Sequence, residues 1–557
     1  MTLRGMSCYN CSMNETEKID YKYVYEKSRK LYRVVLDRPT YNKETKKTTH
    51  HYETVGKAKE KGGEIEFGSK YAAIHDIEEK KEKVPAVKEV IPSGETLVLE
   101  KASKEVGLNK TLVSAFGKEK AQKIEALVFY LLCTGDAMMD SEEWCNSRNL
   151  KGLAGPRISE LFPTINETTC SSFFSEWVKA KAKDKSVCYD ITSVSTYATD
   201  MDIAEYGYNR DHEKWLKQIN LAMVTDKESH IPLVFRPLNG SLSDSKTLID
   251  TAREFEGYGA KPYGFIMDRG FWKKVFLDML YEKRIKVCIP VPSSVGWAKE
   301  LIRKHKNDVF TSFYEDEQGN ITFCYTVYDP QGEGRKVWAH IYYSPSVAET
   351  KKAKFCKEYA QRRKELEEDR PNEKYRSFYD EYFTVSRKGQ GGKPHVTEKK
   401  TLSDILNENL FGYWVLYTDM EKDAIKALIM YRDRTYIEAG FDDLKGATDA
   451  RRLRTRKSES VYGRLFIQFC AQILRTVLRN KIRLFDADTK KYASSPDTLL
   501  KRVKSYSKVK FSGKYKPQYS APTKGQRLIF KALGIEVQNS SPDYDGDASE
   551  TERNLSP

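Results

Sequence analysis

Residues 431–445, YRDRTYIEAGFDDLK, combine an aromatic side chain, carboxylates and cations at a spacing that can bring them together. At about 100° per residue in an α-helix, an arc of about 60° contains Tyr431, Arg434, Glu438 and Lys445. A carboxylate ligates a hard cation, and Arg and Lys neutralise a phosphodiester, so this face suits a metal ion beside a phosphate. The spacing of Arg434 and Glu438 equally fits a solvated face with an i,i+4 ion pair.

Two further carboxylates lie in apolar, strand-like runs: Asp190 in KSVCYDITSVS and Asp268 at the end of YGFIMD. A carboxylate in such a run is costly unless it is paired or binds a cation, so both join Glu438 in a candidate metal site. Hard oxygen ligands favour Mg²⁺ or Mn²⁺ over zinc, and two such ions suit phosphoryl transfer. Asp442, on the face of Glu438, and Asp244, in NGSLSD, remain alternative ligands.

The elements around these acids predict an α/β fold with a mixed sheet. Strand-like runs INLAMVTD and IPLVFRPLNG follow Asp190, and then come a helical segment, the strand of Asp268 and the strand KVCIPV. Three β-like runs and a charged helix interrupt this pattern, which resumes at YWVLYTD and continues into one helix carrying residues 431–445. We therefore expect a catalytic core of residues 185–294 plus 412–484, split by a β-rich insertion domain at 295–411.

The flanking sequence divides by composition and periodicity. We expect a disordered arm (1–20), a small β-domain (21–92), a helical domain (93–184), a basic C-terminal region (485–536) and a disordered tail (537–557). The β-domain contains a hairpin around residues 40–48, whose lysines suit either a DNA backbone or a solvated turn. The helical domain suits either binding to a DNA end or a plain bundle.

The charge indicates an acidic partner such as nucleic acid or anionic lipid, because the 557 residues carry a net charge of +15. Residues 445–527 hold 22 Lys and Arg against 5 Asp and Glu. Among them, Arg451 and Arg452 fit either an exposed loop or a phosphate clamp. No apolar run is long enough to span a membrane and no secretory leader pattern is present, so we expect a cytoplasmic protein with no membrane partner. The ten cysteines are scattered, and Cys8-x-x-Cys11 lacks a second ligand pair for zinc.

The sequence resembles bacterial insertion-sequence transposases of the DDE class, in the branch with the signature Tyr-x2-Arg-x3-Glu-x6-Lys. That spacing is matched without a gap by Tyr431, Arg434, Glu438 and Lys445. YDITS around Asp190 and MDRGFW around Asp268 look like the family's two earlier acid motifs, with GYNRD and PLNGSLSD between them. The likeness covers residues 185–483 and, more weakly, the flanks.

The resemblance implies a ribonuclease H-like catalytic core that nicks transposon ends and joins them to target DNA. It implies that Asp190, Asp268 and Glu438 bind two Mg²⁺ or Mn²⁺ ions. It also implies a homodimer synapsed on terminal inverted repeats, in the bacterial cytoplasm at the nucleoid. The alternatives are a ribonuclease H-like nuclease without strand transfer and a catalytically silent DNA-binding derivative.

The resemblance also implies DNA contacts. Tyr431, Arg434 and Lys445 would touch phosphates near the cleaved end. A tryptophan before the signature helix stacks on a flipped base in some relatives. Trp414 fits that place, although packing in the core is the alternative, and Trp297 and Trp338 are weaker candidates. Arg269, beside Asp268, suits either a DNA contact or a carboxylate pair.

Overall fold

The structure is a computed structural model of the chain. It describes residues 21–75, 86–182, 186–213, 215–241, 244–259, 263–387, 389, 392–446, 452–512 and 516–537. The expected arm at 1–20, Cys8 and Cys11, and the expected tail beyond residue 537 lie outside this range. The chain forms two compact units, Met1–Ala86 and Val87–Pro557, and each is described by itself.

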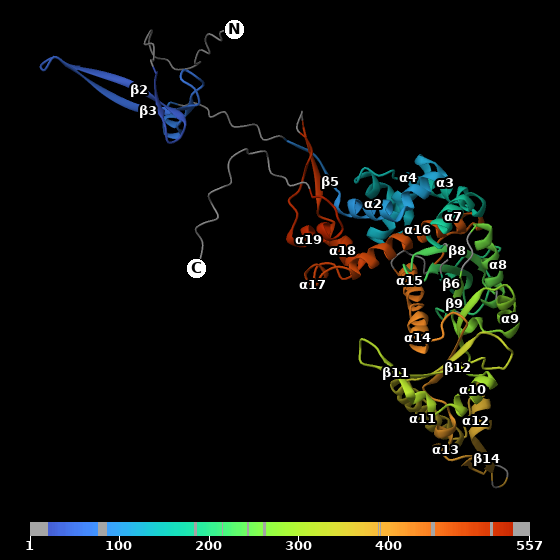
Figure 1. Ribbon diagram of the computed structural model, residues 1–557. Coiled ribbons are helices and arrows are strands. Elements are labelled where there is room, and N and C mark those ends of the chain that lie inside the picture. The colour runs from blue at the N-terminus through green and yellow to red at the C-terminus, as the bar shows by residue number, and fades with distance from the viewer. Residues whose placement is uncertain are drawn as a thin grey trace. The chain divides into compact units, whose positions relative to one another are not determined.

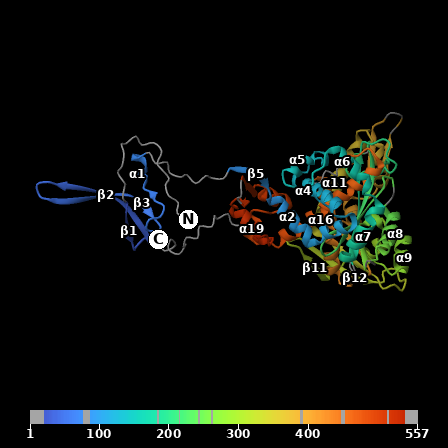
Figure 2. The same cartoon turned by 90° about the horizontal axis from the view of Figure 1, so that it is seen from above.

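The first unit is a four-stranded antiparallel sheet with strand order β1-β2-β3-β4. Its elements are β1 (Tyr21–Glu26), β2 (Leu31–Asn42), β3 (Lys47–Ala58), β4 (Glu66–Phe67) and α1 (Ser69–Ile74). Val34, Val35 and Val55 are buried in its small core. Because β1 pairs only with the first half of β2, the outer halves of β2 and β3 form a two-stranded hairpin that projects from the sheet (Figures 1 and 2).

Residues 87–92 do not belong to the small β-domain, so this part of the prediction is wrong. They form β5 (Val87–Pro92), which pairs with β17 (Ser507–Phe511), and β17 in turn pairs with β18 (Gln518–Tyr519). The sequence of β5, VKEVIP, gives no local indication of its partner. Here the partner comes from the far end of the chain.

The helical segment shares its core with the rest of the second unit. It contains α2 (Gly94–Val106), α3 (Leu108–Phe116), α4 (Lys118–Thr134), η1 (Met138–Asp140), α5 (Ser141–Asn146), α6 (Gly155–Leu161), η2 (Phe162–Thr164) and α7 (Glu167–Ala182). The mostly buried α16 (Ser458–Arg483) packs against α2, α4 and η2 (Figure 1). Gly463 permits this contact, since a Cβ there would lie 2.2 Å from the carbonyl oxygen of Phe162.

A nine-stranded mixed sheet forms the centre of the second unit and confirms the expected mixed α/β fold. In spatial order its strands are β11 (Ser312–Glu315), β12 (Ile321–Tyr328), β13 (Trp338–Tyr343), β16 (Tyr413–Thr418), β10 (Lys286–Val291), β9 (Gly264–Met267), β6 (Ser186–Thr196), β7 (Lys217–Asp226) and β8 (Pro232–Asn239). β9 runs parallel to both β6 and β10, and the other neighbouring strands are antiparallel. Between β8 and β11, the described helical segments along the chain are α8 (Asp244–Gly257), η3 (Arg269–Phe271), α9 (Lys274–Glu282), α10 (Gly296–Lys304) and η4 (Asp308–Thr311).

The expected insertion at 295–411 is not a separate body throughout. Strands β11, β12 and β13 extend the central sheet through β16. The later elements pack around a cluster of their own that contains Tyr359, Tyr379 and Phe383. They are α11 (Pro345–Glu367), α12 (Arg376–Tyr382), β14 (Phe383–Arg387), β15 (Pro394–Glu398) and α13 (Leu402–Glu408).

The helix expected to carry residues 431–445 is two helices, which corrects the single-helix prediction. α14 (Ala424–Arg432) ends before Asp433, and α15 (Thr435–Gly446) begins after Arg434. The buried Ile437, Phe441 and Leu444 fix α15 against β6 and α16. After α16, the described residues contain three short helices, α17 (Ala487–Lys490), α18 (Pro496–Val503) and α19 (Lys524–Ala532). Within the described ranges, no helix has the length and apolarity needed to cross a bilayer.

Candidate active site

Asp190 and Asp268 are neighbours across two parallel strands. Tyr189 in β6 is in register with Met267, the last residue of β9, so the next residue on each strand is an acid. Neighbouring strands lie about 4.8 Å apart, so the two carboxyl groups lie close together at the edge of the sheet where β9 ends. Asp190 is 4% exposed, whereas the Asp268 side chain is 41% exposed.

Glu438 reaches the same edge from the first turn of α15, with its side chain 48% exposed. The link between the three acids is Arg434, in the break between α14 and α15. Its Nη1 donates to Oδ2 of Asp190 over 3.1 Å, and its Nη2 donates to Oε1 of Glu438 and lies 3.9 Å from Oδ1 of Asp268. Three carboxylates from separate elements therefore converge on one guanidinium.

Burial and charge act against each other at this cluster. Burial raises the pKa of Asp190 to about 6, and the nearby Arg210 and Arg434 only partly offset it. Burial opposes ionisation of Arg434 as well, but the surrounding Tyr431, Asp190, Glu438 and Asp268 outweigh it and raise its pKa. Burial also raises the pKa of Tyr431 to about 12. The ionised form of these acids is therefore stabilised by a positive charge beside them.

The donor set fits a hard divalent ion, because it consists of three carboxylates that already share one cation. In the described part of the chain, no three His, Cys, Asp or Glu side chains come close enough together to hold a metal. Here the Arg434 guanidinium lies among the acids and keeps their oxygens apart. A metal ion held by all three acids would compete with this guanidinium for the same oxygens.

Two further cations expected to bind DNA are held by acids from the segment between β6 and β7. Lys445 Nζ lies 2.8 Å from both carboxylate oxygens of Asp211. Arg452 donates to Oε1 of Glu213 over 2.6 Å, and its guanidinium lies over the Tyr197 ring. These pairs join the start of the basic region to the edge of the sheet near Asp190.

Arg210 was missed by sequence reasoning. Its Nη1 lies 3.5 Å from Oδ1 of Asp190, and its backbone N–H donates to the Ser193 hydroxyl. It belongs to GYNRD, between the two acid motifs, and this position was the available signal.

Trp414 lies in a small aromatic cluster beside the site. Its ring stacks on Tyr342 with centroids 4.5 Å apart, and Tyr431 lies 5.8 Å away. The other two candidate tryptophans lie elsewhere. Trp297 contacts Trp272 and Tyr417, and Trp338 contacts Tyr328.

The remaining candidates differ in position. Arg269 is exposed in the turn after Asp268. Asp442 is exposed one turn beyond Glu438 and makes no contact with Arg434 among the described interactions. Arg451 and the side chain of Asp244 lie outside the described residues.

Comparison with known proteins identifies the domain. Residues 181–474 match the family described as "Transposase DDE domain". The chain belongs to this family. Asp190, Asp268 and Glu438 all fall within the matched DDE domain, as does most of α16.

Other comparisons add little to the DDE assignment. A solved structure described as a piggyBac transposase synaptic complex with hairpin DNA is similar at 10% identity, over 83% of this chain and 86% of that chain, with a TM-score of 0.36. A TM-score this low supports no conclusion about the fold or the function of this chain. A search of curated proteins found no match.

Proposed function

We propose that the protein is a DNA transposase that cuts transposon ends and joins them to target DNA by phosphoryl transfer assisted by two divalent ions. The observation that carries this proposal is the convergence of Asp190, Asp268 and Glu438 on the Arg434 guanidinium. Membership of the transposase DDE domain family supports the same general activity.

The catalytic core is proposed to be ribonuclease H-like. Support comes from the strand order β8-β7-β6-β9-β10, with an antiparallel meander followed by two parallel strands. In such a sheet, acids on the central strand and on its parallel neighbour share one edge. A helix packed on the sheet then adds the third acid.

Asp190, Asp268 and Glu438 would hold Mg²⁺ or Mn²⁺. When bound, such a pair of ions activates the attacking oxygen and stabilises the leaving oxygen. The cationic Arg434 and Lys445, with Tyr431, would orient the scissile phosphodiester by hydrogen bonds and charge. Arg452 and Arg269 would hold the DNA backbone farther from the scissile bond. Trp414 would stack on a base only by leaving its contact with Tyr342.

The wider biology belongs to the same proposal. We assign the chain to a bacterial insertion sequence, acting at the nucleoid as a homodimer synapsed on terminal inverted repeats. The helical segment and the basic C-terminal region would bind the ends. Support comes from the excess of basic residues between 445 and 527.

The test uses labelled duplexes taken from the DNA that borders the gene. Asp190→Asn and Glu438→Gln should abolish Mg²⁺-dependent nicking while DNA affinity stays within about threefold. Asp442→Asn is the matched control, since it removes an exposed carboxylate from the same helix and should retain nicking. Nicking that survives either of the first two changes would overturn the assignment of the acids.

A second assay separates a transposase from a nuclease. Pre-nicked ends are incubated with a supercoiled target plasmid and Mg²⁺. A transposase joins the 3′-hydroxyl to the plasmid, whereas a nuclease only cuts it. Salt-dependent DNA binding without any metal-dependent product would instead identify a silent derivative.

A further inference from the structure

The outer hairpin of the first unit is a two-stranded ribbon without a supporting layer. Its strands, residues 37–42 and 47–52, pair only with each other, from Asp37 opposite Tyr52 to Asn42 opposite Lys47. Nearly all of these side chains are exposed, including the Tyr41 and Tyr52 rings. A two-stranded hairpin is marginally stable alone in water, so a surface that covers this ribbon would stabilise it.

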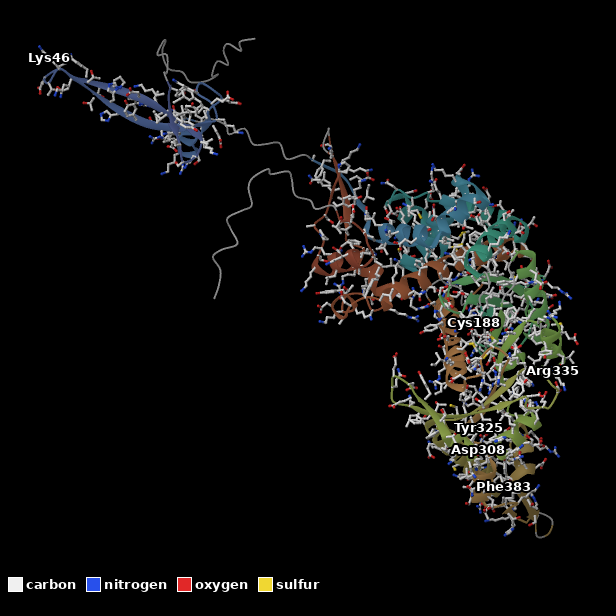
Figure 3. The ribbon with its side chains drawn as sticks, in the orientation of Figure 1. Lys46, Cys188, Asp308, Tyr325, Arg335 and Phe383 are labelled. Carbon is white, nitrogen blue, oxygen red and sulfur yellow. The ribbon has the colours of Figure 1, made fainter. Side chains whose placement is uncertain are left out.

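The tip of the ribbon is ordered by its own contacts. Oδ1 of Asn42 accepts from the backbone N–H of Glu44 at 2.9 Å and of Thr45 at 3.2 Å. Lys46 has a φ of 49°, in the left-handed region, where glycine or asparagine is less strained. These contacts fix the backbone of the turn from which the lysines project, and Figure 3 shows Lys46 at the outer end of the hairpin.

Charge is distributed unevenly along the ribbon. The acids near its base are neutralised locally, since Asp37 contacts Lys22 at 2.5 Å and His50 at 2.8 Å, and Glu53 contacts Arg38 at 3.2 Å. Residues 43–47 contain three lysines and one acid. In the described structure, no carboxylate pairs with Lys43, Lys46 or Lys47. The tip therefore carries net positive charge that the described residues of its unit do not balance.

We propose that this ribbon enters the major groove of duplex DNA, with the three tip lysines on the flanking phosphates. A major groove about 12 Å wide admits a two-stranded ribbon directly, whereas entry into the minor groove, about 6 Å wide, requires the DNA to be deformed at a cost in free energy. Six residues per strand give about 20 Å of ribbon, enough to cross the groove. Thr40, Thr48 and Thr49 supply short hydroxyl groups on its exposed surface. The identity of the DNA rests on the proposed function, but the shape and charge of the ribbon do not.

The first experiment measures binding of the full chain to a 40-base-pair duplex from the DNA that borders the gene. The variant carries Lys43→Gln, Lys46→Gln and Lys47→Gln. We expect an affinity loss of about 10- to 100-fold at about 0.1 M salt. The salt slope, which is the slope of log K against the logarithm of the salt concentration, should be smaller in magnitude by about two to three, because each phosphate contact contributes about 0.9. The matched control, Lys27→Gln, Lys30→Gln and Lys59→Gln, removes the same charge from exposed positions of the same unit and should bind within about threefold of wild type. Equal binding by both triple variants would overturn the proposal.

The second experiment identifies the groove and the occupant. Wild-type protein should protect guanine N7, in the major groove, from dimethyl sulfate at positions that the tip variant leaves reactive. A photo-crosslinking residue at Tyr41 should link to DNA. A crosslink to a second copy of the chain in its place would show the ribbon to be a protein interface and would overturn the proposal.

These outcomes are separate from the test of the proposed function. If wild-type protein nicks the duplex and the tip variant still binds it normally, the ribbon assignment fails and the transposase assignment stands. If no metal-dependent product forms but the tip variant loses affinity, the ribbon remains a DNA contact in a protein that is not an active transposase.

Discussion

Arg434 donates a hydrogen bond to Asp190 over 3.1 Å, although the two residues lie 244 positions apart in the sequence. The same guanidinium also reaches Glu438 and Asp268. It serves as the shared counter-charge of the acid cluster. Its Nε–H is buried and has no acceptor among the described residues. A buried donor without a hydrogen bond costs free energy of folding. This arrangement favours an arginine that moves when other ligands enter.

Removal of this counter-charge should strengthen metal binding without DNA. We expect Arg434→Gln to bind Mn²⁺ at least about fivefold more tightly than wild type, because a like charge about 4 Å away costs about 1 kcal/mol even in water. Isothermal titration of the free protein measures this effect. Arg432→Gln is the control, since its guanidinium lies over Tyr314 and 3.9 Å from Asp316, with no described contact to the three site acids. Unchanged or weaker binding by Arg434→Gln would show that the arginine does not compete with the ion.

The Lys445–Asp211 pair should set how strongly the protein binds DNA phosphates. Asp211→Asn frees the lysine, so DNA affinity should rise several-fold and the salt slope should steepen. Lys445→Gln should reduce the slope by about one. Both are measured by titration of a fluorescent duplex between about 0.05 and 0.2 M salt. Lys351→Gln, an exposed lysine on α11, is the control. If both variants at the pair keep the wild-type slope, Lys445 does not contact phosphate.

His230 should make the fold sensitive to acid. Burial, with a contribution from Arg483, lowers the pKa of His230 to about 4 from 6.5. The folded state thus favours neutral imidazole, so this contribution is complete above pH 6.5 and is lost as the pH falls toward 4. The loss amounts to about 2 kcal/mol after partial screening by solvent.

In the wild type, the centroids of the His230 and Tyr436 rings lie 3.9 Å apart. His230→Phe keeps an aromatic ring at this contact and removes the titrating group. The difference in thermal midpoint between pH 7.5 and pH 4.5 should shrink by a few degrees relative to wild type. An unchanged pH dependence would contradict the assignment of the acid sensitivity to this histidine.

Gly463→Ala should destabilise the second unit. Alanine gains up to about 1 kcal/mol over glycine within a helix, but here its Cβ would lie 2.2 Å from the carbonyl oxygen of Phe162. Separating α16 from η2 to relieve that contact costs about 3 kcal/mol, so the clash prevails. Thermal unfolding should show a midpoint several degrees lower. Gly257→Ala, with open space around its Cβ, should leave the midpoint within about a degree or raise it.

The sequence was most informative where burial and polarity conflict. Asp190 was recognisable because it interrupts an apolar strand and Asp268 because it ends one, and the register of β6 with β9 puts them side by side. The register itself was not predictable, since pairing between distant strands leaves no local pattern. The mixed sheet was predicted from the order of strand-like and helical runs and was confirmed. Its extension by β11, β12 and β13 required knowledge of partners that only the fold provides.

The helix break shows a different limit. An unbroken helix predicts that Arg434 and Glu438 share one face, and their contact exists. The break at Asp433 and Arg434 carries no Pro or Gly to signal it. It results from packing of α14 and α15 on different parts of the sheet, so the inward direction of Arg434 could not be read from spacing. Arg210 was missed for a related reason, because loop residues have no periodicity that predicts where they point.

The pairing of β5 with β17 has a consequence for synthesis of the chain. Ser507 and Pro92 are partners in that ladder, so a strand made early must wait for one made about 420 residues later. At about 5 to 20 residues per second, this wait is on the order of 20 to 90 seconds on the ribosome. The edge of β5 stays unpaired throughout that time. The second unit therefore cannot complete its fold before residues 507–511 have been synthesised.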